Sequence, residues 1–190
     1  MQRVGPFSGK RFVIFLLIPI LLHAFLIALD YVTKYFAQKE AVSVTVIEDF
    51  FYLSFTLNSG AAFSFLADKP WGQTVFMILT PIALVAFVAF YVFAAKKKYK
   101  WLAYSLVLVV SGTVGNYIDR IMSGKVVDFL QFKFGSYYFP TFNVADICLT
   151  VGVIMLIAHF CFFDDNAIFK KRVNGGANSD VKTRESDEIK

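Results

Sequence analysis

Between Gly115 and Asp146 the chain reads GNYIDR (115–120), VVDFLQFKF (126–134) and FPTFNVAD (139–146). Two long apolar segments flank this stretch, which carries three aspartates, one arginine and two asparagines: Asp119, Asp128, Asp146, Arg120, Asn116 and Asn143. A carboxylate beside hydrocarbon is costly unless it is paired, hydrated or protonated, so ionisable residues there indicate a functional site. The alternative is that the aspartates end helices where interfacial water solvates them. The clustering of the whole set favours a site.

The composition favours a membrane protein. Of the 190 residues, 57% are hydrophobic and 23 are Phe, and the mean hydropathy is +0.60, which exceeds that of an ordinary soluble domain. The net charge of +5 comes from Lys and Arg at the ends of apolar runs and not from one basic face. This distribution indicates membrane topology, and we expect no nucleic-acid partner.

The cysteines and histidines do not form a recognisable site. Cys148 and Cys161 lie in the last apolar run, about 20 Å apart along a helix, too far for a disulfide. His23 and His159 are isolated on apolar segments, and no spacing typical of metal ligands occurs. We therefore interpret all four as residues of membrane spans and expect no metal or cofactor.

Hydropathy predicts four membrane spans, at about residues 12–29, 75–95, 101–118 and 142–163. Together they form a single membrane-embedded domain of residues 1–170, followed by a polar, disordered cytoplasmic tail at 171–190.

The first span could open as a secretory signal. However, Leu26 stands where a cleavage site needs a small residue, and the helical pattern continues through Lys34. We therefore expect a retained first span, bent at Pro19.

Two stretches alternate between apolar and polar residues with the period of a strand. Residues 42–57 contain the Val42-Val44-Val46 and Leu53-Phe55-Leu57 series, and residues 126–139 contain Leu130, Phe132 and Phe134. The fold class is therefore a mainly α membrane protein, a four-transmembrane-helix bundle with a small extracytoplasmic β-sheet whose apolar face suits lipid or a lipidated ligand.

The loop NSGAAF (58–63) follows the second predicted strand. Its small residues, including Gly60 and Ala62, permit close backbone approach, and Asn58 offers donors and acceptors to a bound peptide. As a motif this loop is weak by itself.

Helical spacing predicts how some polar side chains pair. Asp30 and Lys34 lie at i and i+4 on one helical face, so they can pair with each other. Asp119 and its neighbour Arg120 point about 100° apart, and we expect each to find another partner. Asn143 and Asp146, at i and i+3, face the same way in the first turn of the last span, where the helix N-terminus stabilises an anion.

The basic residues predict the orientation. Lysines and arginines before the first span, at Lys96–Lys100 and at Lys170–Arg172 place both termini and the middle loop in the cytoplasm. The polar residues of separate segments then converge at the outer face, as a single site requires: Asp30, Asn58, Asp119, Arg120, Asp128, Asn143 and Asp146.

A small membrane transporter or proton-relay protein is the alternative function, because carboxylates in membranes also relay protons and ions. A transporter is expected to place charges near the midplane, often with internal repeats or broken helices. The middle of every span here is apolar, and no repeat is present. A scaffold without chemistry would leave the outer aspartates unexplained.

Five motifs in the chain resemble, in order, those of bacterial lipoprotein signal peptidase (signal peptidase II): DYVTK (30–34), NSGAAF (58–63), GNYIDR (115–120), VVDF (126–129) and FPTFNVAD (139–146). The likeness covers about residues 12 to 163. It implies a multi-pass aspartyl endopeptidase of the bacterial cytoplasmic (inner) membrane, with its active site near the outer face. We expect the protein to be a monomer. Such an enzyme removes signal peptides from diacylglyceryl-modified prolipoproteins, cutting before the lipidated cysteine, with membrane lipids as its surroundings.

Carried over by position, Asp128 and Asp146 match the catalytic pair of the family. The substrate-binding or supporting residues that the resemblance implies are Asp30, Lys34, Asn58, Gly60, Ala62, Asn116, Asp119, Arg120 and Asn143. The sequence departs from the family pattern at Tyr31, Ser111, Thr113 and Ile147-Cys148. These departures leave the pair intact and concern local packing.

The sequence also bears on the mechanism. We expect no serine or cysteine to have a nearby histidine that activates it, so peptide hydrolysis would use a water molecule and carboxyl groups. Two carboxyls held close together cannot easily both ionise, and one keeps its proton. Which aspartate keeps the proton stays open at this point, although the helix N-terminus favours Asp146 as the anion.

Overall fold

The computed structural model describes residues 9–60 and 71–163. The first helical segment runs without interruption through α1 (Gly9–Phe12), a π-helical turn η1 (Val13–Leu17) and α2 (Ile18–Lys39). Three further helical segments follow: α3 (Gly72–Lys97), α4 (Lys100–Ser123), and α5 (Val144–Ala158) with its extension η3 (His159–Phe163).

Four helices in the described part of the chain are long and apolar enough to cross a membrane, which confirms the predicted spans. Two of them extend well beyond the predicted ends. The first continues to Lys39 and α4 continues to Ser123, because the helical hydrogen bonds persist where the apolar run stops. The tail at 171–190 lies outside the described residues, and the domain boundary near residue 170 stays a prediction.

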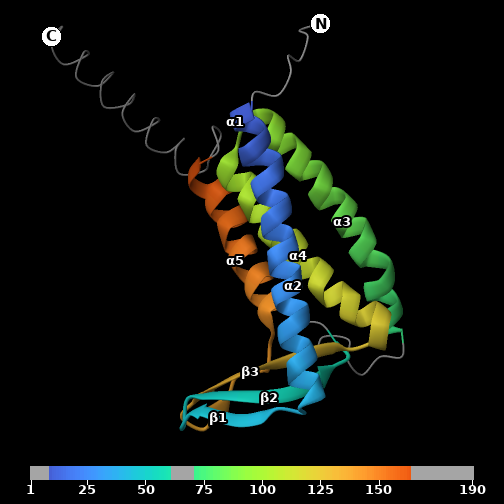
Figure 1. The fold of residues 1–190 in the computed structure, drawn as a ribbon, viewed down its shortest axis with the longest axis vertical. Coiled ribbons are helices and arrows are strands. Elements are labelled where there is room, and N and C mark those ends of the chain that lie inside the picture. The colour runs from blue at the N-terminus through green and yellow to red at the C-terminus, as the bar shows by residue number, and fades with distance from the viewer. Residues whose placement is uncertain (1–8, 61–70, 164–190) are drawn as a thin grey trace, which may run out of the picture.

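An antiparallel sheet lies at one end of the bundle (Figure 1). Its strands, in spatial order, are β1 (Ser43–Ile47), β2 (Phe51–Asn58), β3 (Val126–Phe134) and β4 (Tyr137–Tyr138). These bounds confirm the strands expected from the alternating sequence. The register between β2 and β3 shifts between Leu53 and Thr56, and such a bulge bends a strand and strengthens its twist.

The helix α4 is the centre of the bundle and packs against α2, α3 and α5. In its most apolar window 56% of residues are buried, compared with none in α3. Its contact with α5 is close, because a Cβ at Gly112 would overlap the carbonyl oxygen of Ala145. Small residues at such positions let membrane helices approach each other closely.

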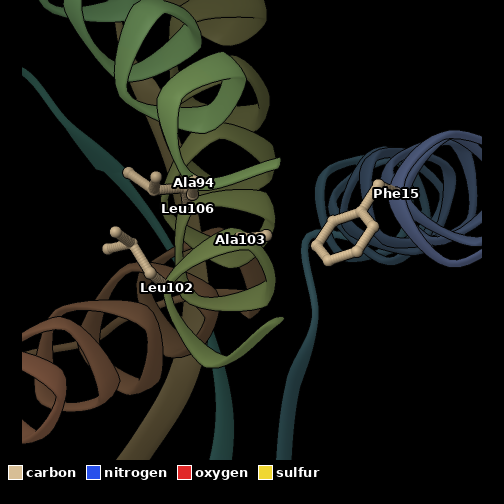
Figure 2. Packing of buried hydrophobic residues seen from close by; sticks show 5 residues of the cluster. All are labelled: Phe15, Ala94, Leu102, Ala103 and Leu106. Atoms are coloured by element: carbon tan, nitrogen blue, oxygen red, sulfur yellow. The ribbon is translucent and has the colours of Figure 1, made fainter. Parts of the chain in front are cut away.

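A cluster of buried apolar side chains closes the end of the bundle opposite to the sheet. Figure 2 shows Phe15, from the first helical segment, facing Ala103 of α4, with Ala94, Leu102 and Leu106 nearby. The outer surface of the bundle is also apolar: Leu21 is 59% exposed and Val85 72% exposed. Apolar surface of this extent is typical of helices that face lipid.

The four residues that we interpreted as parts of spans all lie in helices. Cys148 in α5 and Cys161 in η3 are free thiols. His23 in α2 lies 2.7 Å, Nδ1 to Oγ, from Ser111 of α4. The expectation that no serine has a nearby histidine is therefore wrong for Ser111. Neither Ser111 nor His23 lines the pocket described below, and their contact helps to hold α2 against α4.

Candidate active site

Asp146 is fixed at the start of α5 by a reciprocal cap. Its backbone N–H donates to Oδ1 of Asn143 at 2.9 Å, and its carboxylate Oδ2 accepts from the backbone N–H of Asn143 at 3.3 Å. This capping box satisfies two helix-terminal donors. The carboxylate also lies at the positive end of the helix dipole, where an anion is stabilised.

Asp128 lies on β3 and is 1% exposed. Its Oδ1 accepts a hydrogen bond of 2.7 Å from Nδ2 of Asn143, and its Oδ2 accepts one of 3.0 Å from Nδ2 of Asn58 on β2. The carboxyl group is therefore held between the sheet and the start of α5.

Two asparagines connect the aspartates. Asn116 of α4 donates to Oδ1 of Asp146 at 2.8 Å, and its own Oδ1 accepts from Nδ2 of Asn143 at 3.1 Å. Asn143 is fully buried and Asn116 is 8% exposed. Because side-chain amides both donate and accept, they join two carboxyl groups without adding charge.

Burial raises the pKa of Asp128 to about 6. This pKa already includes the smaller effects: hydrogen bonds from Asn58 and Asn143 and the charge of Lys34 lower it, and the nearby charge of Asp146 raises it. Burial of a carboxyl group disfavours its charged form. Asp128 is thus a carboxyl group that keeps its proton to a higher pH than an ordinary aspartate does.

A buried cluster of one lysine and two further aspartates lies near the site aspartates. Lys34 is 3% exposed, and its Nζ lies 2.7 Å from Asp30, 3.0 Å from Asp119 and 2.9 Å from the Oδ1 of Asn116. The predicted pairing of Asp30 with Lys34 is confirmed.

The two carboxylates of this cluster also hold backbone groups. Asp30 accepts from the N–H of Ala145 at 2.8 Å, and Asp119 accepts from the N–H of Val127 at 3.1 Å. Gly115 makes room for this arrangement, since a Cβ there would lie 2.6 Å from Asp30 Oδ2. The cluster therefore joins α2 and α4 to β3 and α5, the elements that carry the two site aspartates.

Arg120 holds the loop after β2. One terminal nitrogen donates to the carbonyl of Gly60 at 2.8 Å, and the other donates to the carbonyl of Asn116 at 3.3 Å. The guanidinium group lies over the ring of Phe76, 4.7 Å from its centroid. Asp119 and Arg120 have separate partners, as expected. Ala62 lies outside the described residues.

A pocket of about 960 Å³ opens in front of the aspartates. Its polar wall includes Asn58, Arg120, Asp128 and Asp146, and an apolar part lies between the helices. No cluster of three or more His, Cys, Asp or Glu that could hold a metal ion occurs in residues 9–60 and 71–163. The arrangement can place a peptide bond and a water molecule beside two carboxyl groups, of which Asp128 has a raised pKa.

The family model of signal peptidase (SPase) II matches residues 22–162. The chain belongs to the signal peptidase II family. Two lipoprotein signal peptidases are similar to this chain. The protein of Symbiobacterium thermophilum is 42% identical, over 70% of this chain and 87% of its own length. The protein of Bacillus pumilus is 39% identical, over 69% of this chain and 84% of its own length.

Two solved structures of bacterial membrane enzymes have the same fold. Their TM-scores are 0.68 and 0.66, at 33% and 34% sequence identity. The matches cover 81% and 79% of this chain and 96% of each solved chain. The resemblance drawn from the five motifs is thus confirmed, and membership of a peptidase family favours hydrolysis over the transporter alternative.

Four residues that line the pocket of this signal peptidase II chain were not predicted from its sequence. Phe76 and Thr80 of α3, and Gln131 and Tyr138 of the sheet, also line it. None of these residues belongs to one of the five motifs. A single polar or aromatic residue within an apolar or alternating run gives no signal of its own. Only the packing of the helices and the sheet brings these side chains to the pocket.

Proposed function

We propose that Asp128 and Asp146 are the catalytic pair with which this aspartic endopeptidase removes signal peptides from lipoprotein precursors. The substrates are prolipoproteins that carry diacylglycerol, cut before the lipidated cysteine. One observation carries the proposal: two carboxyl groups, joined through Asn143, both line one pocket.

The different surroundings of the two carboxyls support a division of roles. Asp146, as the anion, takes a proton from a water molecule while the water oxygen attacks the scissile carbonyl carbon. Asp128 has a pKa of about 6 and is the proton donor: it gives its proton to the carbonyl oxygen. The bond between carbon and nitrogen then breaks as a proton passes from Asp146 to the leaving amine of the cysteine. At the same time Asp128 takes back a proton from one of the two hydroxyl groups on that carbon, which leaves a carboxylic acid and returns both aspartates to their starting states.

The other polar residues act as supports in this proposal. Asn58, Asn116 and Asn143 orient the carboxyls through the hydrogen bonds described above. Asp30, Lys34 and Asp119 fix the elements on which the pair lies, and Arg120 holds the substrate-facing loop at Gly60. Because every one of these groups comes from a single chain, a monomer suffices for activity.

We also propose the orientation in the bacterial inner membrane. The start of α1, the turn from α3 to α4 and the end of η3 lie at the end of the bundle opposite to the sheet (Figure 1). Lys96 and Lys97 end α3, and Lys98 follows in the turn; such residues favour the cytoplasm. A reporter that is active only outside the cytoplasm should work after Gly135 and be silent at Lys98 or after Arg172. The reverse pattern would place the aspartates on the wrong side.

The test of function compares two precursors with the purified protein. One carries diacylglycerol on its cysteine, and its twin has the same sequence without the lipid. We expect cleavage of the first alone, because the pocket opens among apolar groups beside the spans, where acyl chains can lie. Equal cleavage of both precursors would overturn the dependence on lipid, and cleavage of neither would overturn the proposed function.

A further inference from the structure

We propose that a polar hollow on the sheet, next to Gln131 and Tyr138, binds the first residues of the mature chain that follow the cleaved bond. The ligand is a short, extended, uncharged polar segment of polypeptide. This inference rests on the proposed function, since it concerns the part of the substrate that the cut releases from the signal peptide.

The hollow adjoins the catalytic pocket. It has a volume of about 210 Å³, and its lining includes Thr45, Tyr52, Gln131 and Tyr138. Gln131 and Tyr138 also line the pocket that contains the two aspartates. A chain that leaves the catalytic pocket past these two side chains therefore enters the hollow directly.

The strand register explains why the hollow is polar. Thr45 pairs with Tyr52, and Tyr52 pairs with Gln131. Because directly paired residues lie on the same face of a sheet and alternate residues share a face, these three polar side chains form one face.

The opposite face of the same strands is apolar. Leu53 pairs with Leu130, and Phe51 pairs with Phe132. The ring centroids of Phe51 and Phe132 lie 5.0 Å apart. The sheet thus separates an apolar face from a polar one, and the hollow lies on the polar face.

The groups in the hollow have hydrogen-bonding capacity to spare. The side chains of Thr45, Tyr52 and Gln131 form no side-chain hydrogen bond with other residues in the described part of the chain. They present hydroxyl groups and an amide, which both donate and accept. An extended peptide exposes both kinds of backbone group. The nearby Lys133 is already paired with Asp49 at 2.6 Å, so the hollow favours uncharged residues.

The pocket also fixes the direction of the substrate. Its end among the helices is lined by Phe76, Leu149 and Val151, which suit the apolar segment of a signal peptide. The sheet end is the other exit from the aspartates. The mature side of the chain, which must reach water, therefore passes Gln131 and Tyr138.

The test uses two lipidated substrates with the same signal sequence. One ends as an amide at the lipidated cysteine, and the other continues for several mature residues such as Ser, Asn and Gly. We expect the longer one to have a KM about three- to tenfold lower, as expected for one or two added hydrogen bonds, with kcat little changed. Thr45→Val, outside the catalytic pocket, should raise KM for the longer substrate alone, and Gln131→Ala should raise KM more for the longer substrate than for the shorter one.

The control is Tyr137→Ala, because Tyr137 is 58% exposed and lies outside both linings. It should change KM for neither substrate. Equal KM values for the two substrates with the wild-type protein, or an equal rise for both in Gln131→Ala, would overturn the inference. If neither substrate were cleaved, the proposed function would fail. Binding of the same two lipopeptides, labelled with a fluorophore, would then still test the inference. A lower Kd for the longer lipopeptide would support it, and equal Kd values would overturn it.

Discussion

The side-chain amide of Asn143 donates a hydrogen bond of 2.7 Å to Oδ1 of Asp128. The oxygen of the same amide accepts from the backbone of Asp146 and so caps α5. One buried side chain thus sets the position of a carboxyl on the sheet relative to a carboxyl on a helix. The geometry of the pair therefore depends on a residue that itself takes no part in proton transfer.

Substitution of Asn143 separates its two roles. Asn143→Ala removes both the hydrogen bond to Asp128 and the cap of α5. We expect kcat to fall about a hundredfold, which is the effect of displacing a catalytic group by about 1 Å. Loss of the cap should also cost about 1 kcal/mol of stability. Asn143→Ser keeps a good cap but is too short to reach Asp128. Thermal unfolding in detergent should therefore show near wild-type stability for Asn143→Ser, while single-turnover cleavage stays slow. Full activity of the Ser variant would contradict the positioning role.

The two carboxyls should act as one unit. Asp128→Asn and Asp146→Asn should each abolish cleavage, because one proton donor and one proton acceptor are both needed. The double variant should be no slower than either single variant, since effects within a catalytic unit are not additive. Cleavage of a lipidated precursor gives the rates, and membrane insertion with precursor binding serves as the control for folding. A well-folded single variant with most of its activity would exclude the pair.

Lys34 should matter mainly for stability. Lys34→Met leaves Asp30 and Asp119 buried without their cation, and breaking a buried pair in this way costs about 3–5 kcal/mol. The double variant Asp30→Asn with Lys34→Met removes one of the stranded charges and should recover part of the loss. Unfolding in detergent measures both effects. If Lys34→Met were as stable as the wild type, the cluster would not hold the helices together.

Local spacing predicted part of this site. The helical offset of four residues gave the pairing of Asp30 with Lys34, and the offset of three gave the cap between Asn143 and Asp146. Alternation of residues gave the strands, and hydropathy gave the spans. Each of these features depends on residues that are close in sequence, where the repeat of the backbone dictates which side chains meet.

Contacts between distant segments could not be predicted in the same way. Lys34 reaches Asn116 on another helix, and Arg120 reaches the carbonyl of Gly60, because α4 packs closely against its neighbours. The end of the first helix was predicted only in part: the helical pattern was followed to Lys34, and the helix ends at Lys39. The hollow beside Gln131 depends on strand register, which alternation alone does not determine.

Arg120 should act as a support for the loop at Gly60. Lysine keeps the charge but lacks the planar fork that contacts two carbonyls, so Arg120→Lys should lower activity or yield and leave some cleavage. Arg120→Ala should lower them further. Rates of precursor cleavage, normalised to the amount of folded protein, distinguish these variants. Wild-type activity in Arg120→Ala would show that the contact with Gly60 supports nothing.

The stability of the protein should fall as the pH rises through the range in which Asp128 ionises. Burial raises the pKa of this carboxyl from 3.8 to about 6 in the folded state, so the folded protein holds a proton that the unfolded chain has already released. The contribution of this proton to the free energy of unfolding is fully present below about pH 3.8. It declines between about pH 3.8 and about pH 6, and it is lost above about pH 6. The whole change corresponds to roughly 3 kcal/mol. Unfolding in detergent at pH 4, 5, 6 and 7 should show this decline in the wild type and a flatter profile in Asp128→Asn, because asparagine does not titrate. Parallel profiles would mean that Asp128 ionises at its ordinary pKa.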